Sequence, residues 1–401
     1  MIDEDKKARL TRILYLLGFL DMFGIGMLLP FLPRMIKLLG FSHFVAGVLG
    51  SLYGALQIFS STLMGKLSDI QGRKGVYVLS CFGPAISYMF IGISSTAICL
   101  VAARVIAGLL KHGLSTGKVV LTDITPPEEL SKTLGYYQAI SNGGFIVGPA
   151  LGGYLIDWDP SYALAAYACS SMFFLSSILS VTFVPSGKLN KTATNNTDEE
   201  QKSYISLIFD SKHFSTHKDL IILRFMLTFA VLMLRSSFSI FITEKFGIDN
   251  ITLGYIMSFN GIIGTLSSAN VGNIASFYTS QITLLKHLLY LLSLSLIFIS
   301  LSPTITLVIV GLIPLSIATS NLRVCLTNLS LARASSDEKG ALIGLSYSVS
   351  SLSRMISPTL VGILQEFNVT LPCYVSGLSA ITATLMSVLV YPLPDIVKKE
   401  Q

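Results

Sequence analysis

Long apolar stretches alternate with short polar segments along almost the whole chain of 401 residues. Most of the apolar stretches run for about 20 residues or more, the length that an α-helix needs to cross a bilayer. The pattern therefore predicts an all-α membrane protein. We expect twelve membrane-spanning helices, near residues 11–36, 43–64, 76–97, 98–121, 133–157, 161–184, 219–244, 250–273, 281–301, 303–327, 340–365 and 371–391.

One longer polar segment, residues 185–217, divides the predicted helices into two sets of six. This segment is rich in Lys, Asn, Asp and Glu, as expected of a solvated linker. We expect an N-terminal six-helix bundle in residues 1–184, a cytoplasmic linker in residues 185–217 and a C-terminal six-helix bundle in residues 218–401.

The two halves of the chain also repeat one another. A shift of 207 positions relates five residues of the first half to the second: Gly40 to Gly247, Gly47 to Gly254, Ser51 to Ser258, Gly54 to Gly261 and Gly65 to Gly272. A shift of 209 relates Gly135, Pro149 and Gly153 to Gly344, Pro358 and Gly362. The repeat therefore predicts two equivalent six-helix bundles.

Composition supports a membrane protein, because 52% of the residues are hydrophobic and only 12% are charged. Soluble domains carry about 25% charged residues. If both termini are cytoplasmic, most loop Lys and Arg residues lie inside, and only Arg34, Lys37 and Lys245 lie in outside loops. This bias predicts cytoplasmic termini. The net charge of +6 then follows from the cytoplasmic loops and implies no nucleic-acid partner.

The segment Gly65–Lys74 reads Gly-x-Leu-x-Asp-x-x-Gly-Arg-Lys between two predicted helices. This pattern resembles the cytoplasmic signature between helices 2 and 3 of major facilitator superfamily transporters. The resemblance implies two six-helix bundles and a cytoplasmic charge cluster that holds one face shut. In this chain the matching residues are Gly65, Asp69, Gly72 and Arg73, with Asp123 at the end of helix 4 as the partner of Arg73.

Two further stretches are similar to drug/proton antiporters of the tetracycline-resistance type. One is Leu20–Gly26 in helix 1, and the other is the helix 5 run Gly144-x-x-x-Gly148-Pro149-x-x-Gly152-Gly153. Arg104 followed by Gly108 resembles the helix 4 signature of the superfamily. The stretches Gly108–His112 and Arg354–Pro358 resemble a branch of the superfamily assigned to organic solutes. These likenesses imply transport with a small organic solute and a proton as partners.

Several charged residues fall inside predicted spans, where each costs about 2.5–3.5 kcal/mol on insertion scales. Helix 4 carries Arg104, Lys111 and Lys118 at seven-residue spacing, which places them close to one face. The other cations are Arg235, Arg323 and Arg354 in helices 7, 10 and 11. Because the resemblance places helices 1, 4, 7 and 10 around the central cavity, we expect a cationic cavity that favours organic anions.

Asp21 is the acid that lies deepest in helix 1, and we expect it to couple transport to protons. A permanent salt bridge to a cation of helix 4 or helix 11 is the alternative. Lys118 also fits a lysine that snorkels to the interface, and His112 a packed, hydrogen-bonded histidine. Arg354 fits a structural charge as well as a ligand. The sequons at Asn250 and Asn368 lie in predicted outside loops but very close to a helix.

No Walker loop, HExxH motif or Gly-x-Ser-x-Gly nucleophile turn occurs in the chain, and the five cysteines form no CxxC pair. We therefore expect no enzyme activity, no cofactor, no metal and no disulfide framework. Three classes of function remain. The favoured one is a proton-coupled secondary transporter of organic solutes that works as a monomer. The others are an exporter of hydrophobic drugs and a non-transporting sensor or partner protein on the same fold.

Overall fold

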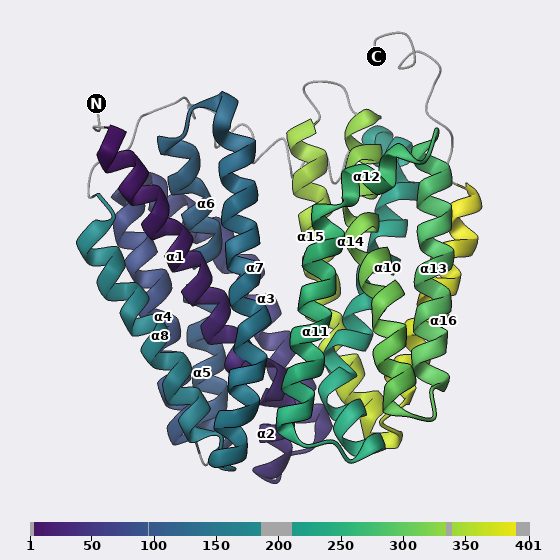
Figure 1. The fold of residues 1–401 in the computed structure, drawn as a ribbon, viewed down its shortest axis with the longest axis horizontal. Coiled ribbons are helices and arrows are strands. Elements are labelled where there is room, and N and C mark those ends of the chain that lie inside the picture. Colours follow the sequence, from purple (N-terminus) through teal and green to yellow (C-terminus); the bar gives the residue numbers. More distant parts are fainter. Residues whose placement is uncertain (1–3, 95, 186–210, 334–338, 390–401) are drawn as a thin grey trace. The chain divides into compact units, whose positions relative to one another are not determined.

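The computed structural model of the protein describes residues 4–94, 96–185, 211–333 and 339–389, and these residues form helices without any strand (Figure 1). The helices of the first half are α1 (Glu4–Leu28), η1 (Leu29–Phe31), α2 (Leu32–Leu38), α3 (His43–Gln71), α4 (Arg73–Ile93), α5 (Ala97–Leu110), α6 (Gly113–Ile124), α7 (Pro127–Trp158) and α8 (Ala163–Phe183). Those of the second half are α10 (Ser211–Phe246), α11 (Asn250–Ala269), α12 (Val271–Ser276), α13 (Gln281–Leu301), α14 (Ile305–Ala332), α15 (Lys339–Phe367), α16 (Leu371–Met386) and η2 (Ser387–Leu389).

Nine helical segments of the described chain are long and apolar enough to cross a membrane. They coincide with nine of the predicted spans. At the other three positions the chain is also helical, as α11, α15 and the shorter apolar helix α16. The all-α membrane fold is therefore confirmed, whereas the count of twelve spans stays a prediction.

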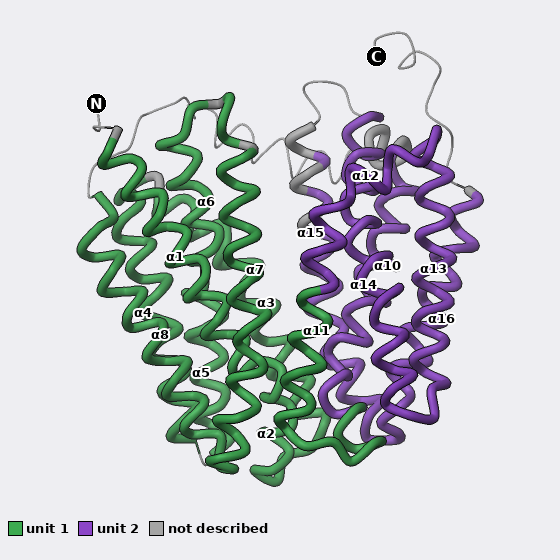
Figure 2. Tube along the Cα trace, in the orientation of Figure 1, with its two compact units in different colours: residues 1–193, 242–262 green, residues 194–241, 263–401 purple. Residues whose placement is uncertain are grey.

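The chain divides into two compact units, coloured separately in Figure 2. Unit 1 comprises residues 1–193 and 242–262, and unit 2 comprises residues 194–241 and 263–401. The end of α10 and the first part of α11 therefore group with unit 1. These bounds differ from the predicted bundles 1–184 and 218–401, which stay a proposal. Most of the predicted linker lies outside the described residues.

Unit 1 is built around α1, which packs against α7 and α8. Its core contains Leu14, Leu17, Tyr77, Val120 and Tyr137, all fully buried. α4 packs against α5 and α8, and α3 packs against α5. α3 and α5 therefore lie close enough for their polar side chains to interact.

Unit 2 uses small polar residues where its helices meet. α13 packs against α14 and α16. The hydroxyls of Ser293 and Thr384 lie 2.8 Å apart between α13 and α16, and Ser376 Oγ donates to the carbonyl of Ala230 in α10 at 2.6 Å. Such residues let membrane helices approach closely and satisfy polar groups that lipid cannot.

The repeat is visible at one pair of turns. Gly40 and Gly247, which the 207-position shift relates, both have positive φ, +83° and +66°. A residue with a Cβ is strained in this left-handed region, so glycine is favoured at each turn.

The charged segment Gly65–Lys74 differs from the loop that its composition suggests. α3 continues through Gly65 to Gln71, α4 begins at Arg73, and only Gly72 between them is non-helical, with φ +94°. Gly65 lies inside a helix with no other atom within 4 Å of its virtual Cβ. Gly65 therefore continues the helix, and the turn is made at Gly72 alone.

Candidate functional site

Glycines allow α1 and α7 to approach each other closely in unit 1. A Cβ at Gly144 would meet the Phe19 carbonyl oxygen, one at Gly148 would lie 2.7 Å from the Phe23 oxygen, and one at Gly152 would meet the Met27 oxygen. Pro149 Cδ lies at a similar level, 3.1 Å from the virtual Cβ of Gly26. The four residues predicted from the helix 5 pattern therefore lie together at one helix interface, which places the α1 backbone beside α7.

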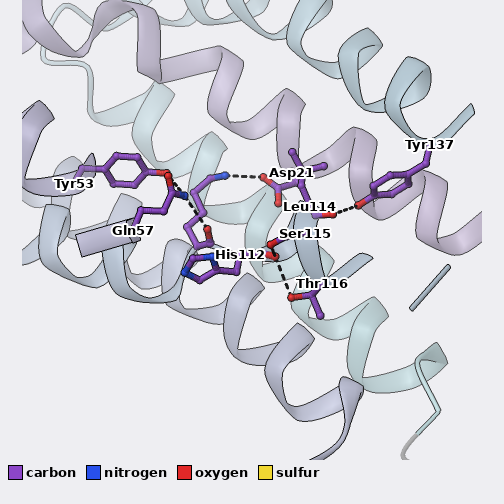
Figure 3. A network of polar contacts seen from close by, with 9 residues as sticks. Asp21, Tyr53, Gln57, His112, Leu114, Ser115, Thr116 and Tyr137 are labelled. Carbon is purple, nitrogen blue, oxygen red and sulfur yellow. Dashed lines mark hydrogen bonds and ion pairs between the residues drawn. The ribbon is translucent and has the colours of Figure 1, made fainter. Parts of the chain in front are cut away.

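The predicted helix 98–121 is two helices, which sequence reasoning missed. α5 ends at Leu110 and α6 begins at Gly113, so Lys111 and His112 form a helix break in the middle of the span Ala97–Ile124. Kinks usually follow from Pro, Gly pairs or inserted polar groups. Neither broken residue is Pro or Gly, and polar side chains of α3 lie against the break, as Figure 3 shows. Arg104, Lys111 and Lys118, which were expected near one helix face, therefore do not lie on one continuous helix.

Asp21 and Lys111 form a buried ion pair at this break (Figure 3). Lys111 Nζ lies 3.1 Å from Asp21 Oδ1, and the side chains are only 9% and 5% exposed. Asp21 Oδ2 points at the start of α6, 2.5 Å from a virtual Cβ on Gly113. Lys111 thus has a carboxylate partner within the protein, and its contact with substrate stays a prediction.

Arg104 lies one turn before Gly108 on α5 and is buried. Its guanidinium carbon lies 5.9 Å from the centre of the Tyr53 ring of α3, a cation–π geometry. Lys118, by contrast, is exposed and donates to Gln138 Oε1 at 2.8 Å. The three cations of the predicted stripe therefore have three different environments, of which only those of Arg104 and Lys111 are buried.

In unit 2, three of the predicted arginines have exposed side chains: Arg235 on α10, Arg323 on α14 and Arg354 on α15. The charges of Arg323 and Arg354 both act on Arg235, so the structure brings these predicted residues together. We call them the arginine cluster. An exposed cation at membrane depth requires water, protein or a ligand around it, because lipid tails cannot solvate it.

The cytoplasmic charge cluster is described in part. Arg73 Nε donates to Asp123 Oδ2 at 2.8 Å, as predicted, and Arg73 Nη1 donates to Ser68 Oγ at 3.0 Å. Asp69 lies in α3, but its side chain is outside the described part of the structure. Its predicted contact with the start of helix 11 at Gly340 stays a prediction.

A second charge cluster, not predicted from the sequence, lies in unit 1 at the turn after α2. Glu244 of α10 forms an ion pair with Lys37, and its Oε1 lies 3.3 Å from His43 Nε2. Nearby, Arg34 Nη1 donates to Asn250 Oδ1 at 2.7 Å. The only signal in the sequence was that basic residues of the outside loops are rare and concentrated here. Among the described residues, no group of three His, Cys, Asp or Glu side chains could hold a metal ion.

Residues 14–358 of the sequence match the family model of the Major Facilitator Superfamily. The quinolone resistance protein NorA of Staphylococcus aureus (strain COL) is 24% identical over 366 residues, which are 91% of this chain and 92% of that protein. The multidrug resistance protein 1 of Bacillus subtilis (strain 168) is 26% identical over 377 residues, covering 92% and 93% of the two chains.

Solved structures agree with this match at the level of the fold. The human organic anion transporter MFSD10 (TETRAN) superimposes with a TM-score of 0.66 and 19% identity, over 95% of this chain and 99% of that one. The nucleoside transporter NupG superimposes with a TM-score of 0.77 and 15% identity, over 95% and 98%. On this evidence the chain belongs to the major facilitator superfamily of membrane transporters.

Proposed function

We propose that this transporter is a proton-coupled secondary carrier of small organic solutes, that it works by alternating access and that it prefers organic anions. The observation that carries the anion preference is the arginine cluster. Two or three guanidinium groups can hold a carboxylate or phosphate with paired hydrogen bonds, which a lysine cannot do. The structural likeness to MFSD10, an organic anion transporter, supports this choice.

The positions of the described acidic residues in unit 2 also support the preference for organic anions. Its described carboxylates are Asp219 and Glu366. Asp219 is paired with Arg333, whose Nη1 lies 2.7 and 2.9 Å from the two carboxylate oxygens. Glu366 lies one residue before the end of α15, twelve positions after Arg354 and so about 18 Å further along the helix. An anion bound at the arginine cluster would reduce the repulsion between its cations, so binding would relieve a penalty as well as form contacts.

Coupling to protons is assigned to the pair Asp21–Lys111. A carboxylate that is paired with a buried lysine holds a proton weakly, whereas one that has lost its partner in an apolar site holds a proton more strongly. A substrate anion that takes Lys111 would therefore release Asp21 to accept a proton. If the pair never separates, Asp21 is structural and coupling requires another group.

Export of hydrophobic drugs is the second candidate. It is supported by NorA and the Bacillus subtilis protein, whose names refer to quinolone and multidrug resistance. Because Asp21 is paired with Lys111, this region suits uncharged substrates better than a stripe of unpaired cations would. We further propose cytoplasmic termini and a monomer, with the lipid bilayer as the surrounding partner.

Thermal stabilisation of the purified full-length protein by a panel of organic anions and cations tests the anion preference. Ligands that bind the folded state raise its melting temperature. We expect organic anions to stabilise the protein, and Arg323→Gln and Arg354→Gln to reduce this effect at least severalfold. Lys118→Gln, which removes a cation outside the cluster, is the matched control. Stabilisation by cationic drugs alone, unaffected by the two arginine variants, would favour the drug exporter.

A further inference from the structure

The helix break leaves four backbone carbonyls at the end of α5 without their usual partners. In a continuous helix, the carbonyls of Gly108, Leu109, Leu110 and Lys111 would accept from the amides four residues later. The break lies near the middle of a membrane span, with 14 residues of α5 on one side and 12 of α6 on the other. At this depth little water is present to replace lost hydrogen bonds, so other protein groups must supply them.

Three of these four carbonyls accept hydrogen bonds from groups other than their usual amides, and two of the three donors come from α3. Ser60 Oγ lies 2.9 Å from the carbonyl oxygen of Gly108, and Gln57 Nε2 donates to that of Lys111 at 3.3 Å. The third partner belongs to the break itself, because the amide of His112 donates to the Leu110 oxygen at 2.9 Å.

The two α3 side chains are arranged as a pair. Gln57 and Ser60 are three positions apart, so they lie on one face of α3. Ser60 Oγ is also 2.8 Å from His112 Nε2, which ties the ring to α3. Without these donors, the Gly108 and Lys111 carbonyls would best be satisfied by the amides of His112 and Ser115, that is, by continuation of the helix. The α3 donors therefore compete directly with closure of the break.

The break determines where Lys111 points. Its backbone has ψ +82°, outside the helical range, and its Nζ reaches Asp21 on α1. The same break places Gly113, the first residue of α6, beside Asp21 Oδ2. A continuous helix would rotate Lys111 relative to α1 and would change both contacts.

We propose that Gln57 and Ser60 are positioning residues, which hold the helix break open and thereby keep Lys111 paired with Asp21. The functional meaning of this pair rests on the proposed proton coupling, whereas the positioning itself does not. The ion pair of the coupling site is then controlled by a neighbouring helix that carries no charge at this site.

A double-mutant cycle on the full-length protein in lipid nanodiscs tests this, with the melting temperature as the readout and no substrate required. Asp21→Asn leaves Lys111 buried without its carboxylate and should lower the melting temperature. In the Ser60→Ala or Gln57→Leu background, we expect Asp21→Asn to lower it by less than half as much, because the pair is already displaced. Residues that act through one network are non-additive in this way.

Two variants of α3 complete the design. Ser61→Ala is the matched control, since Ser61 is exposed and donates to the Ile58 carbonyl of its own helix at 2.8 Å; the full effect of Asp21→Asn should persist there. Ser60→Thr retains the hydroxyl and should restore that full effect. Strict additivity of Asp21→Asn with both Ser60→Ala and Gln57→Leu would overturn the proposal. Because no transport is measured, this outcome would leave the transport function untouched.

Discussion

Lys37 and Glu244 form an ion pair although they lie 207 positions apart, the same offset that relates Gly40 to Gly247. Equivalent positions of the two sequence repeats thus contact each other beside equivalent turns. His43 adds a second basic group to Glu244. The pair ties the segment after the first span to the end of α10, and we expect it to open when these segments separate during transport.

Reversing one charge of this pair should alter transport more than stability. The side chains of Lys37 and Glu244 are 43% and 30% exposed. Ion pairs this exposed contribute only about 0.2–1 kcal/mol to the stability of the fold. We therefore expect Glu244→Lys to change the transport rate by about two- to fivefold. The double variant Lys37→Glu with Glu244→Lys should restore it. The neighbouring Lys245→Glu serves as control, and failure of the double variant to recover would argue against the pair.

Gly144→Ala should strongly destabilise the protein, because the new Cβ would collide with the α1 backbone at Phe19 and Phe23. Overpacking of this kind costs about 1–3 kcal/mol. Gly143→Ala is the matched control, since its Cβ would have only Phe19 Cε2 nearby, at 4.0 Å. Thermal unfolding of both variants measures the difference. Equal melting temperatures would mean that close contact between α1 and α7 is not required.

Asp123→Asn and Arg73→Ala should be coupled. The two groups are 15% and 20% exposed and 2.8 Å apart, so each single change leaves a partly buried charge without this partner. We expect the double variant to be more stable than the sum of the single effects predicts, by about 0.5–3 kcal/mol. Chemical denaturation gives the four values, with Lys74→Ala as the control for loss of a neighbouring cation. Additive effects would show that the contact contributes nothing.

Asp159 should make the turn between α7 and α8 sensitive to acid. Hydrogen bonds from Ser161 and from the amide of Leu164 lower the pKa of its carboxyl group below the usual value. Because the folded form has the lower pKa, the stabilisation is present above the unfolded value of about 3.9 and is lost as the pH falls through the folded value.

Melting curves recorded at neutral and acidic pH should therefore show Asp159→Asn to be less stable than the unaltered protein at neutral pH. The difference should shrink as the solution becomes acidic. Asp157→Asn, two residues earlier in α7, controls for general acid effects. A difference between the two proteins that does not change with pH would contradict the role of the carboxylate.

The apolar pattern was sufficient to predict the helices because membrane burial requires about 20 consecutive apolar residues, a local property of the sequence. Gly72 was predictable as a turn for a similar reason, since a charged segment between two spans must reverse direction. Arg73–Asp123 followed from the superfamily resemblance. These features depend on residues that lie close together or on a shared motif.

The helix break was not predictable, because neither Lys111 nor His112 breaks a helix by itself. Its partners on α3 are Gln57, 54 positions before Lys111, and Ser60, 52 positions before His112. The local signals were Gly113 directly after His112, and Gln57 and Ser60 at helical spacing within the apolar span 43–64. Similarly, the sequence left open whether Asp21 has a permanent partner, because this depends on how α1 packs against the break.

Transport by the purified protein in liposomes tests the central claim most directly. The probe is the radiolabelled organic anion that stabilises the protein most, with an imposed pH gradient and with Asp21→Asn for comparison. We expect the gradient to drive accumulation by the unaltered protein. Asp21→Asn should still exchange the anion across the membrane but should not accumulate it in response to the gradient. Accumulation by Asp21→Asn equal to that of the unaltered protein, or no response of either protein to the gradient, would contradict proton coupling through Asp21.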